Sequence, residues 1–462
     1  MNRPLRVLFI AQVFPYPLDS GPKIRAYYVL RYLASRHRVT LVAFLTHPRE
    51  RRYVDHLASF CEAIYPVERP HSLWREEAAM ARSLLTGRPF MIERHFDAEM
   101  ARLVESLAAE GRYDLIHVDQ VKVAQYALGI EGIPRVIDKH NAYALVLKGV
   151  AGVDPSPLRR LVARFDWRRM ARYEGMLCRI FDGVVAVTDT DRDALLRFSG
   201  DNRPIPVIPI AIDCEAIRPV HRRAGGRDIL ILGSLFYPPN VDGAVWFARE
   251  IFPWVRAEVP DARLLLVGGR PAPGVVALGR ENGVAVTGYV EDLQPYLEQT
   301  AVMAVPLRFG SGMRVKILNG LTWGLPMVST SVGCEGIGVT PERDILLADT
   351  PEAFAHQVVR VLRDRRLADA LSANGRRLAE QRYDWRVLYP RWDEVYAHAL
   401  GSGDWTQHRK DTGKTVENST SSPVPHQDGF GGLCSGRRRG TAALCPYNLR
   451  TREAREGGLG YP

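Results

Sequence analysis

The stretch from residue 306 to residue 326 holds the residues best suited to binding a phosphate. Gly310 and Gly312 flank a serine between an apolar run and a helical pattern, and Arg314 and Lys316 follow in the expected first turn of that helix. Glycines let a backbone approach a phosphate closely, and a helix N-terminus offers free N–H groups and a positive dipole end. Two cations at that end oppose the dipole. We therefore expect a bound anion to offset them.

A second glycine turn, Gly233-Ser234, directly follows an apolar run and precedes a helical pattern over 244–252. It could also present backbone N–H groups to a phosphate, although many strand–helix loops contain glycine. The chain has no GxGxxG motif followed by an acidic residue and no GxxxxGK[ST] motif. A dinucleotide site and a P-loop nucleotidase are therefore disfavoured.

Polar side chains end two apolar runs in the first half of the chain. His117 and Asp119 close one run, and Asp138, His140 and Asn141 close the next. In open parallel sheets ligands bind at the carboxyl ends of strands, where a histidine or carboxylate can orient or deprotonate a hydroxyl. His140 is the strongest candidate, because Asp138 and Asn141 could fix its ring. For any single one of these residues, an ordinary hydrogen-bonded loop residue is the favoured alternative.

Two series of alternating strand and helix patterns must position these residues. We expect strands over 5–10, 38–44, 115–118, 135–138 and 183–187, and again over 229–233, 263–269, 284–288, 302–306 and 326–330. This rhythm predicts an α/β protein with two parallel sheets and a cleft between them. The proline-rich and basic stretch 203–226 predicts a linker between domains 1–202 and 227–383. Residues 401–462, which are poor in branched apolar side chains, predict a disordered tail.

The composition narrows the class of protein. The 462 residues carry a net charge of +10, which favours anionic ligands without choosing among them. No apolar run approaches the roughly 18 residues of a membrane span, and the N-terminus does not have the features of a signal peptide. Six scattered cysteines without a CxxC pair argue against a zinc site and a disulfide framework and fit a reducing cytoplasm. Nucleic acid is the least expected partner, because the basic residues form no recognised module.

Over residues 5–400, the order and spacing of these motifs resemble those of family-4 glycosyltransferases of the GT-B fold. The resemblance in the second half rests on Gly233-Ser234 with Pro239–Asp242, Pro260–Ala262 before Leu264–Gly268, Val286–Val290, Pro306–Pro326 and Ser329–Ile337. In the first half it rests on Ser20–Arg25, Tyr113–His117 and Ile208–Asp213. Within the family, the chain is most similar to sugar transferases of bacterial exopolysaccharide gene clusters.

The resemblance implies two Rossmann-like domains that face a central cleft, with a C-terminal helix over 384–400 packing back across them. It implies retaining transfer of a sugar from a nucleotide diphosphate donor to a saccharide or polyprenyl-linked acceptor, with no metal and no cofactor. The second domain would bind the donor and the first domain the acceptor.

The family also suggests roles for individual residues. Arg314 and Lys316 would stabilise the leaving diphosphate, which develops negative charge. Gly233 and Ser234 would lie behind these cations. The resemblance further implies a loop over the diphosphate at Gly21, and a guanidinium within its reach at Arg25.

The chain departs from the family at Asn319, where members usually carry a glutamate that binds the nucleotide ribose. A second common glutamate corresponds to Ser311, and Ile210-Ala211 stands where the family usually has Asn-Gly. Asn319 keeps hydrogen-bonding capacity but brings no charge. Two alternatives therefore stay open: a non-catalytic GT-B subunit and a GT-B sugar-nucleotide epimerase.

A helical pattern over 156–181 combines regularly spaced apolar residues with many arginines and Trp167. Such a helix can dock on anionic lipid, which would place a cytoplasmic protein at the inner face of the membrane. The same pattern fits an ordinary amphipathic helix with a solvated basic face.

Overall fold

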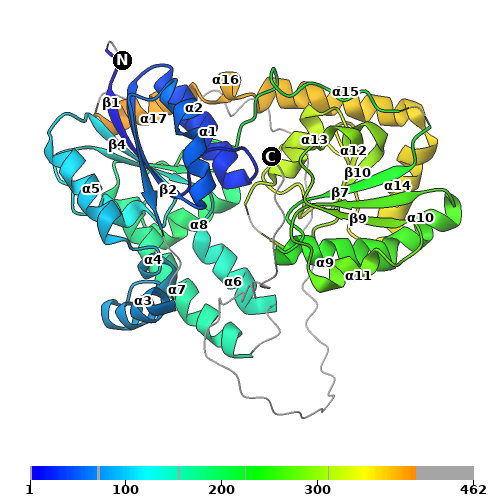
Figure 1. Ribbon diagram of the computed structural model, residues 1–462, viewed down its shortest axis with the longest axis horizontal. Coiled ribbons are helices and arrows are strands. Elements are labelled where there is room, and N and C mark those ends of the chain that lie inside the picture. Colours follow the sequence, from blue (N-terminus) through cyan, green and yellow to red (C-terminus); the bar gives the residue numbers. More distant parts are fainter. Residues whose placement is uncertain (1–2, 70–72, 154–156, 224, 311, 402–462) are drawn as a thin grey trace, which may run out of the picture.

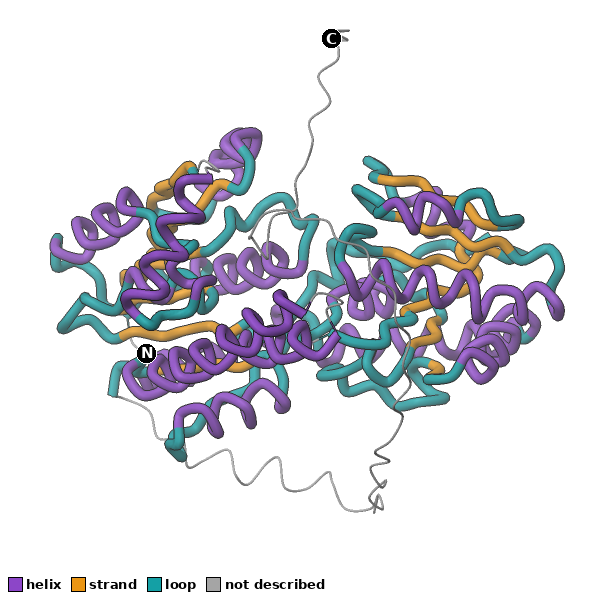
Figure 2. Tube along the Cα trace, turned by 90° about the horizontal axis from the view of Figure 1, so that it is seen from below, coloured by secondary structure: helices purple, strands orange, loops and turns teal. Residues whose placement is uncertain are grey.

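The computed structural model describes residues 3–69, 73–153, 157–223, 225–310 and 312–401. Ser156, Ser311 and residues 402–462 of the predicted disordered tail lie outside these residues. The chain forms two α/β bodies side by side (Figures 1 and 2). Within the described residues, no helix combines the length and the apolar character that crossing a membrane requires.

Each body is built on a six-stranded parallel sheet, so the predicted α/β fold with two parallel sheets is confirmed. The first sheet has the order β3-β2-β1-β4-β5-β6, and the second has the order β12-β11-β10-β7-β8-β9. The strands of the first sheet are β1 Arg6–Ala11, β2 Arg38–Leu45, β3 Ala63–Glu68, β4 Leu115–Asp119, β5 Arg135–Lys139 and β6 Gly183–Ala186. Those of the second sheet are β7 Asp228–Leu232, β8 Arg263–Val267, β9 Val284–Gly288, β10 Thr300–Val305, β11 Met327–Ser329 and β12 Leu346–Leu347.

Helices cover both faces of each sheet. Those that follow the first-body strands are α1 Gly21–Ala34, α2 Val54–Ala58, α3 Leu73–Thr86, α4 Phe90–Glu93, α5 Ala98–Ala109, α6 Tyr143–Val153, α7 Pro157–Ile180 and α8 Asp189–Ser199. The second body contains α9 Pro238–Trp246, α10 Phe252–Glu258, α11 Pro273–Leu278, α12 Gln294–Gln299, α13 Val315–Thr322, α14 Pro351–Arg363 and α15 Arg365–Arg382. The chain ends with α16 Trp385–Leu388 and α17 Arg391–Ala399.

The two sheets share one topology, which fixes where a ligand can bind. In each, the strand order reverses beside the first strand, between β1 and β4 and between β7 and β10. Loops that leave the carboxyl ends of such strands on opposite sides form a crevice. The phosphate-binding candidates follow β7 and β10, and the acceptor-side candidates lie within or just after the carboxyl-terminal halves of β4 and β5.

The two bodies share part of their core. One cluster of buried apolar side chains includes Phe9 of β1, Val305 of β10, Met313 before α13 and Trp392 of α17. The chain crosses between the bodies twice, and these crossings pair where Ile212 bridges to Asp384. The last helices then lie along the first body (Figure 1), where α16 packs on α1 and α17 packs on β5 and β6.

Candidate active site

The loop after β10 needs its glycines. Gly310 and Gly312 have φ angles of 136° and 77°, which lie in the left-handed region that favours glycine. A Cβ on Gly310 would lie 2.8 Å from Nη2 of Arg314, so a larger residue would displace that guanidinium. Arg314 occupies the N-cap position of α13, without a side-chain capping hydrogen bond, and donates from Nη1 to the carbonyl of Gly312. The loop therefore folds around the arginine at the helix N-terminus.

Lys316 meets the first glycine turn of the second body. A Cβ on Gly233 would lie 2.7 Å from its Nζ, so the ammonium group lies directly against that backbone. Nζ donates to Oδ1 of Asn240 at 2.8 Å, and the amide of Asn240 donates to the carbonyl of Ser234 at 3.0 Å. The structure thus brings Gly233, Ser234 and Lys316 together. Asn240 lies within the Pro239–Asp242 motif, but its contact with Lys316 joins α9 to α13 and was not predicted from the sequence.

These two cations lie where charge is costly. Burial lowers the pKa of Lys316 to about 7, and the positive charge of Arg314 acts in the same direction. Burial also lowers the pKa of Arg314. A polyanion bound here would offset both effects.

The first body closes over this site through the N-terminus of α1. A Cβ on Gly21, the first residue of α1, would lie 3.2 Å from Cγ2 of Val315, the first residue of α13. Two helix N-termini therefore approach each other across the cleft. Such termini carry free N–H groups and partial positive charge.

His140 and Asn141 lie at the same place, on the loop after β5. The carbonyl of His140 and Cβ of Asn141 are each 3.8 Å from where a Cβ on Gly312 would be. Nε2 of His140 lies 2.7 Å from Oδ1 of Asp119, at the end of β4. Asp119 is fully buried, and this burial raises its pKa. The pair fixes the imidazole and leaves its Nδ1 for another partner.

Arg25 has a different environment from the one expected. Its guanidinium is fully buried and forms a bidentate ion pair with Asp138, with Nη2 and Oδ1 2.6 Å apart. Its Nη1 donates to the carbonyls of Ile208 and Pro209 at 2.8 and 2.9 Å. This network ties α1, β5 and the interbody segment together. Contact of Arg25 with a diphosphate stays a prediction that this geometry does not favour.

His117 lies deeper than the other candidates. Its ring is fully buried, stacks on Phe9 at 4.4 Å and contacts the hydroxyl of Tyr396 at 2.9 Å through Nδ1. Burial lowers its pKa to about 3, so the ring is neutral at physiological pH. The predicted contact of His117 with an acceptor has no support in this position.

Comparison with known protein families matches both halves of the chain. The model described as "Glycosyltransferase Family 4" matches residues 20–216, and the one described as "Glycosyl transferases group 1" matches residues 226–364. The chain thus carries a family-4 glycosyltransferase domain followed by a group-1 glycosyltransferase domain, arranged in the GT-B fold. A curated relative is an uncharacterized 44.6 kDa protein in the cps region of Klebsiella pneumoniae, 20% identical over 400 residues, which cover 83% of this chain and 98% of the relative.

Solved structures share the fold of this glycosyltransferase. HepE of Anabaena, crystallised with UDP and glucose, superposes with a TM-score of 0.60 at 15% identity, over 85% of this chain and 99% of that one. Sucrose-phosphate synthase of Thermosynechococcus elongatus superposes with a TM-score of 0.66 at 17% identity, over 86% of this chain and all of that one. The comparisons favour a glycosyltransferase over the non-catalytic subunit and the epimerase.

Asn319, at the position where the resemblance to the family implies a glutamate, lies three residues after Lys316 on α13. Residues at this spacing share a helix face, and both side chains are half-buried. Its contact with a nucleotide ribose stays a prediction.

Asp119, Asp138 and His140 of this glycosyltransferase each offer a ligand atom, and these atoms lie within 4.8 Å of one another. The spacing would suit a metal ion. Both oxygens of Asp138 already accept from Arg25, however, and one oxygen of Asp119 contacts His140. The present side chains therefore neutralise much of the charge that would attract a cation.

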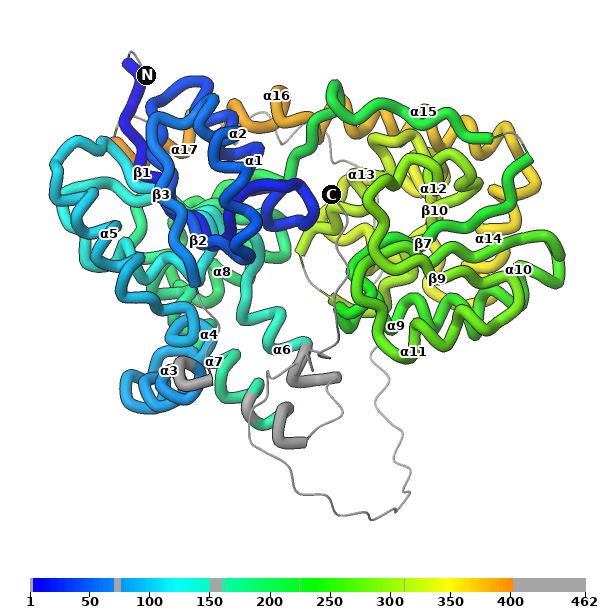
Figure 3. The backbone as a smooth tube through the Cα atoms, viewed as in Figure 1, coloured from blue at the N-terminus to red at the C-terminus, as the bar shows by residue number. Residues whose placement is uncertain are grey.

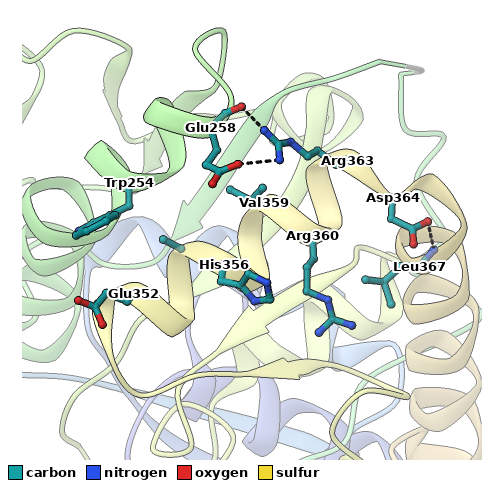
Figure 4. Close-up of a pocket in the computed structure, with 10 residues that line it drawn as sticks. Trp254, Glu258, Glu352, His356, Val359, Arg360, Arg363, Asp364 and Leu367 are labelled. Carbon is teal, nitrogen blue, oxygen red and sulfur yellow. Dashed lines mark hydrogen bonds and ion pairs between the residues drawn. The ribbon is translucent and has the colours of Figure 1, made fainter.

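A separate hollow lies between α10 and α14, at the end of the second body farthest from the first (Figures 1 and 4). It has a volume of about 600 Å³, with Trp254 and His356 among its lining residues and the Glu258–Arg363 ion pair at its edge. None of the candidate site residues of the glycosyltransferase lines it.

Proposed function

We propose that this glycosyltransferase transfers a sugar from a nucleotide diphosphate donor, with retention of anomeric configuration and without a metal ion. The observation that carries the proposal is that Arg314 and Lys316 lie together at the N-terminus of α13, with Lys316 against the backbone of Gly233. Fixed cations and helix N–H groups stabilise a leaving diphosphate where other enzymes use Mg²⁺. The UDP in the HepE complex supports a nucleotide-sugar donor.

The second body provides the residues that bind the diphosphate, and the first body provides those that face the acceptor. Lys316 and Arg314 hold the diphosphate and stabilise the charge that develops when the bond from the sugar C1 to the phosphate oxygen breaks. The acceptor hydroxyl approaches from the side of His140, which Asp119 orients. Retention requires the new C1–O bond to form on the face that the diphosphate leaves. The hydroxyl proton passes to the departing phosphate oxygen or to His140.

The acceptor is a saccharide or a lipid-linked saccharide, and the pathway is the synthesis of an exopolysaccharide or cell-envelope glycan. The relative encoded in a Klebsiella cps region supports this assignment. Asn319 would contribute a neutral hydrogen bond to the ribose in place of a charge-assisted one, which costs on the order of 1 to 2 kcal/mol of donor affinity.

Calorimetric titration of the full chain with UDP and GDP in EDTA tests this proposal. We expect one nucleotide to bind, and Arg314→Ala to weaken it by about 10- to 100-fold, the range for losing a charged hydrogen bond. Arg308→Ala is the matched control, because Arg308 lies on the same loop but is exposed and pairs with Asp242 at 2.8 Å.

The outcomes separate the candidate functions. If neither nucleotide binds, the non-catalytic subunit becomes the better interpretation. Binding that requires a divalent cation would overturn metal independence. Release of free sugar and nucleotide that does not depend on an acceptor would instead support the epimerase.

A further inference from the structure

Among the side chains that the structure describes, those on the outward face of α7 are arginines and apolar groups. Between residues 160 and 172, the exposed side chains that the structure describes are those of Arg160, Leu161, Arg164, Phe165, Arg168 and Arg172. Leu161 and Phe165 are 51% and 62% exposed. The one carboxylate in this stretch, Asp166, is buried and accepts from the backbone of Phe90. The exposed face thus combines positive charge with large apolar groups and carries no negative charge.

Packing holds this face outward. Met170, Tyr173 and Leu177, on the opposite side of α7, belong to the core of the first body. The helix therefore cannot rotate to bury Leu161 and Phe165 without exposing these core side chains. Single exposed apolar residues are common, but here they alternate with arginines along one helix face.

The end of α3 extends the same surface. Leu84 and Leu85 are 66% and 87% exposed, and Nη1 of Arg169 lies 3.4 Å from Oγ of the adjacent Ser83. Helices α3, α6 and α7 together form the lower edge of the first body (Figure 3). We call the exposed residues of 160–172, with Leu84 and Leu85, the α3–α7 surface.

The α3–α7 surface is rigidly connected to the candidate active site. Helix α6 begins at Tyr143, two residues after Asn141. Glu174 of α7 accepts from the backbone N–H groups of Tyr143 and Ala144 at 2.9 Å and pairs with the buried Lys139 at 2.5 Å. The 11 residues of α6 span about 16 Å. Helix α7 packs along α6 and so connects the α3–α7 surface to the loop of His140 and Asn141.

We propose that the α3–α7 surface docks on an anionic lipid bilayer and brings the cleft to an acceptor anchored in the same membrane. The delivery of the cleft to a membrane-anchored acceptor rests on the proposed glycosyltransfer, whereas the docking itself does not. Arginines attract acidic headgroups, and the exposed leucines and phenylalanine enter the boundary between headgroups and acyl chains. A soluble polyanion would use the arginines alone, so the apolar side chains favour the bilayer.

Co-sedimentation of the full chain with phosphatidylglycerol/phosphatidylcholine vesicles, and with phosphatidylcholine vesicles alone, tests the docking. We expect the wild type to bind only the anionic vesicles, and salt to weaken this binding. Arg164→Glu/Arg168→Glu should reduce it at least tenfold, and Phe165→Ser/Leu85→Ser severalfold. Arg366→Glu/Arg377→Glu on α15 makes the same charge change on exposed arginines elsewhere and should leave the binding unchanged.

Three results would overturn the docking: equal binding to neutral vesicles, normal binding by Arg164→Glu/Arg168→Glu, and normal binding by Phe165→Ser/Leu85→Ser. The last of these, with competition by heparin, would identify a soluble polyanion as the ligand instead. UDP titration of each variant keeps the two proposals apart. A variant that loses vesicle binding but binds nucleotide normally tests the docking proposal alone. Failure of the wild type to bind any nucleotide counts against the proposed transferase site alone.

Discussion

At the scale of single residues, Lys316 links protonation to ligand binding. Its pKa is about 7 in the folded protein, against 10.5 for an ordinary lysine, because burial and Arg314 disfavour the charged form. Between these two values the unfolded chain binds more protons than the folded one. The free energy of unfolding therefore rises with pH from about 7 to 10.5 as far as this group is concerned. A bound diphosphate would reverse the effect by favouring the ammonium form.

We predict that the binding of UDP at pH 8 takes up close to one proton, since Lys316 is mostly neutral before binding and charged afterwards. Calorimetry in buffers of different ionisation enthalpy measures this uptake. Lys316→Arg is the control, because a guanidinium stays protonated in both states and should show no uptake. Binding of UDP to the wild type without proton uptake would contradict the contact between Lys316 and the diphosphate.

At the scale of elements, α17 completes the first body from the other end of the chain. Trp392 and Tyr396 are fully buried, and their rings lie 5.1 and 6.1 Å from the ring of His117 on β4. The N-terminal sheet is therefore covered by residues that follow the whole second body. Its stability should depend on this late segment.

We predict that Trp392→Ala lowers the free energy of unfolding of the first body by about 3–5 kcal/mol, the range for removing a buried aromatic side chain. Urea unfolding followed by circular dichroism measures the loss. Val387→Ala on α16, where the side chain is 56% exposed, should change stability by about 0.5 kcal/mol or less. A similar small effect at both positions would mean that α17 is not part of the cooperative core.

The elements that the sequence predicts well are those whose burial is continuous. Strands β1, β2, β4 and β5 are nearly all buried; β1 and β2 appear as largely apolar runs, and β4 and β5 as shorter ones that end in buried polar residues. Strand β3 was missed because it is a half-buried edge strand that contains Pro66. The helix expected over 384–400 is two helices, α16 and α17, separated at Pro390.

In the candidate site, residues that are neighbours in sequence could be predicted, and contacts between distant residues could not. Gly310, Gly312, Arg314 and Lys316 are neighbours in sequence, so local rules of helix termini single them out. The partners of Arg25 could not be predicted in this way. Its ion pair with Asp138 spans 113 positions and exists because the fold brings Arg25 of α1 to the end of β5, a proximity that no local spacing encodes.

At the scale of the whole molecule, the two bodies touch through small residues on either side of the cleft. Gly21 meets Val315, and a Cβ on Gly336 would lie 2.3 Å from Cγ2 of Thr188. The backbone of Ile210 also donates to Sδ of Met313 at 3.2 Å. Glycine at these contacts allows the closest approach of the bodies, which brings the loop of His140 onto the phosphate-binding loop.

The size of residue 21 should therefore limit transfer. We predict that Gly21→Val slows the release of nucleotide from the sugar donor by about 10- to 100-fold, because a displacement near 1 Å at the reacting groups costs this much. Adding Val315→Ala should restore most of the rate, since it removes the methyl group that the new side chain meets. Gly274→Val on α11 is the matched control, because a Cβ there has no neighbour within 4 Å among the described residues. Steady-state rates of the wild type, Gly21→Val, Gly21→Val/Val315→Ala and Gly274→Val test this prediction. If Val315→Ala fails to restore the rate of Gly21→Val, the glycine acts on its own loop and not through the contact between the bodies.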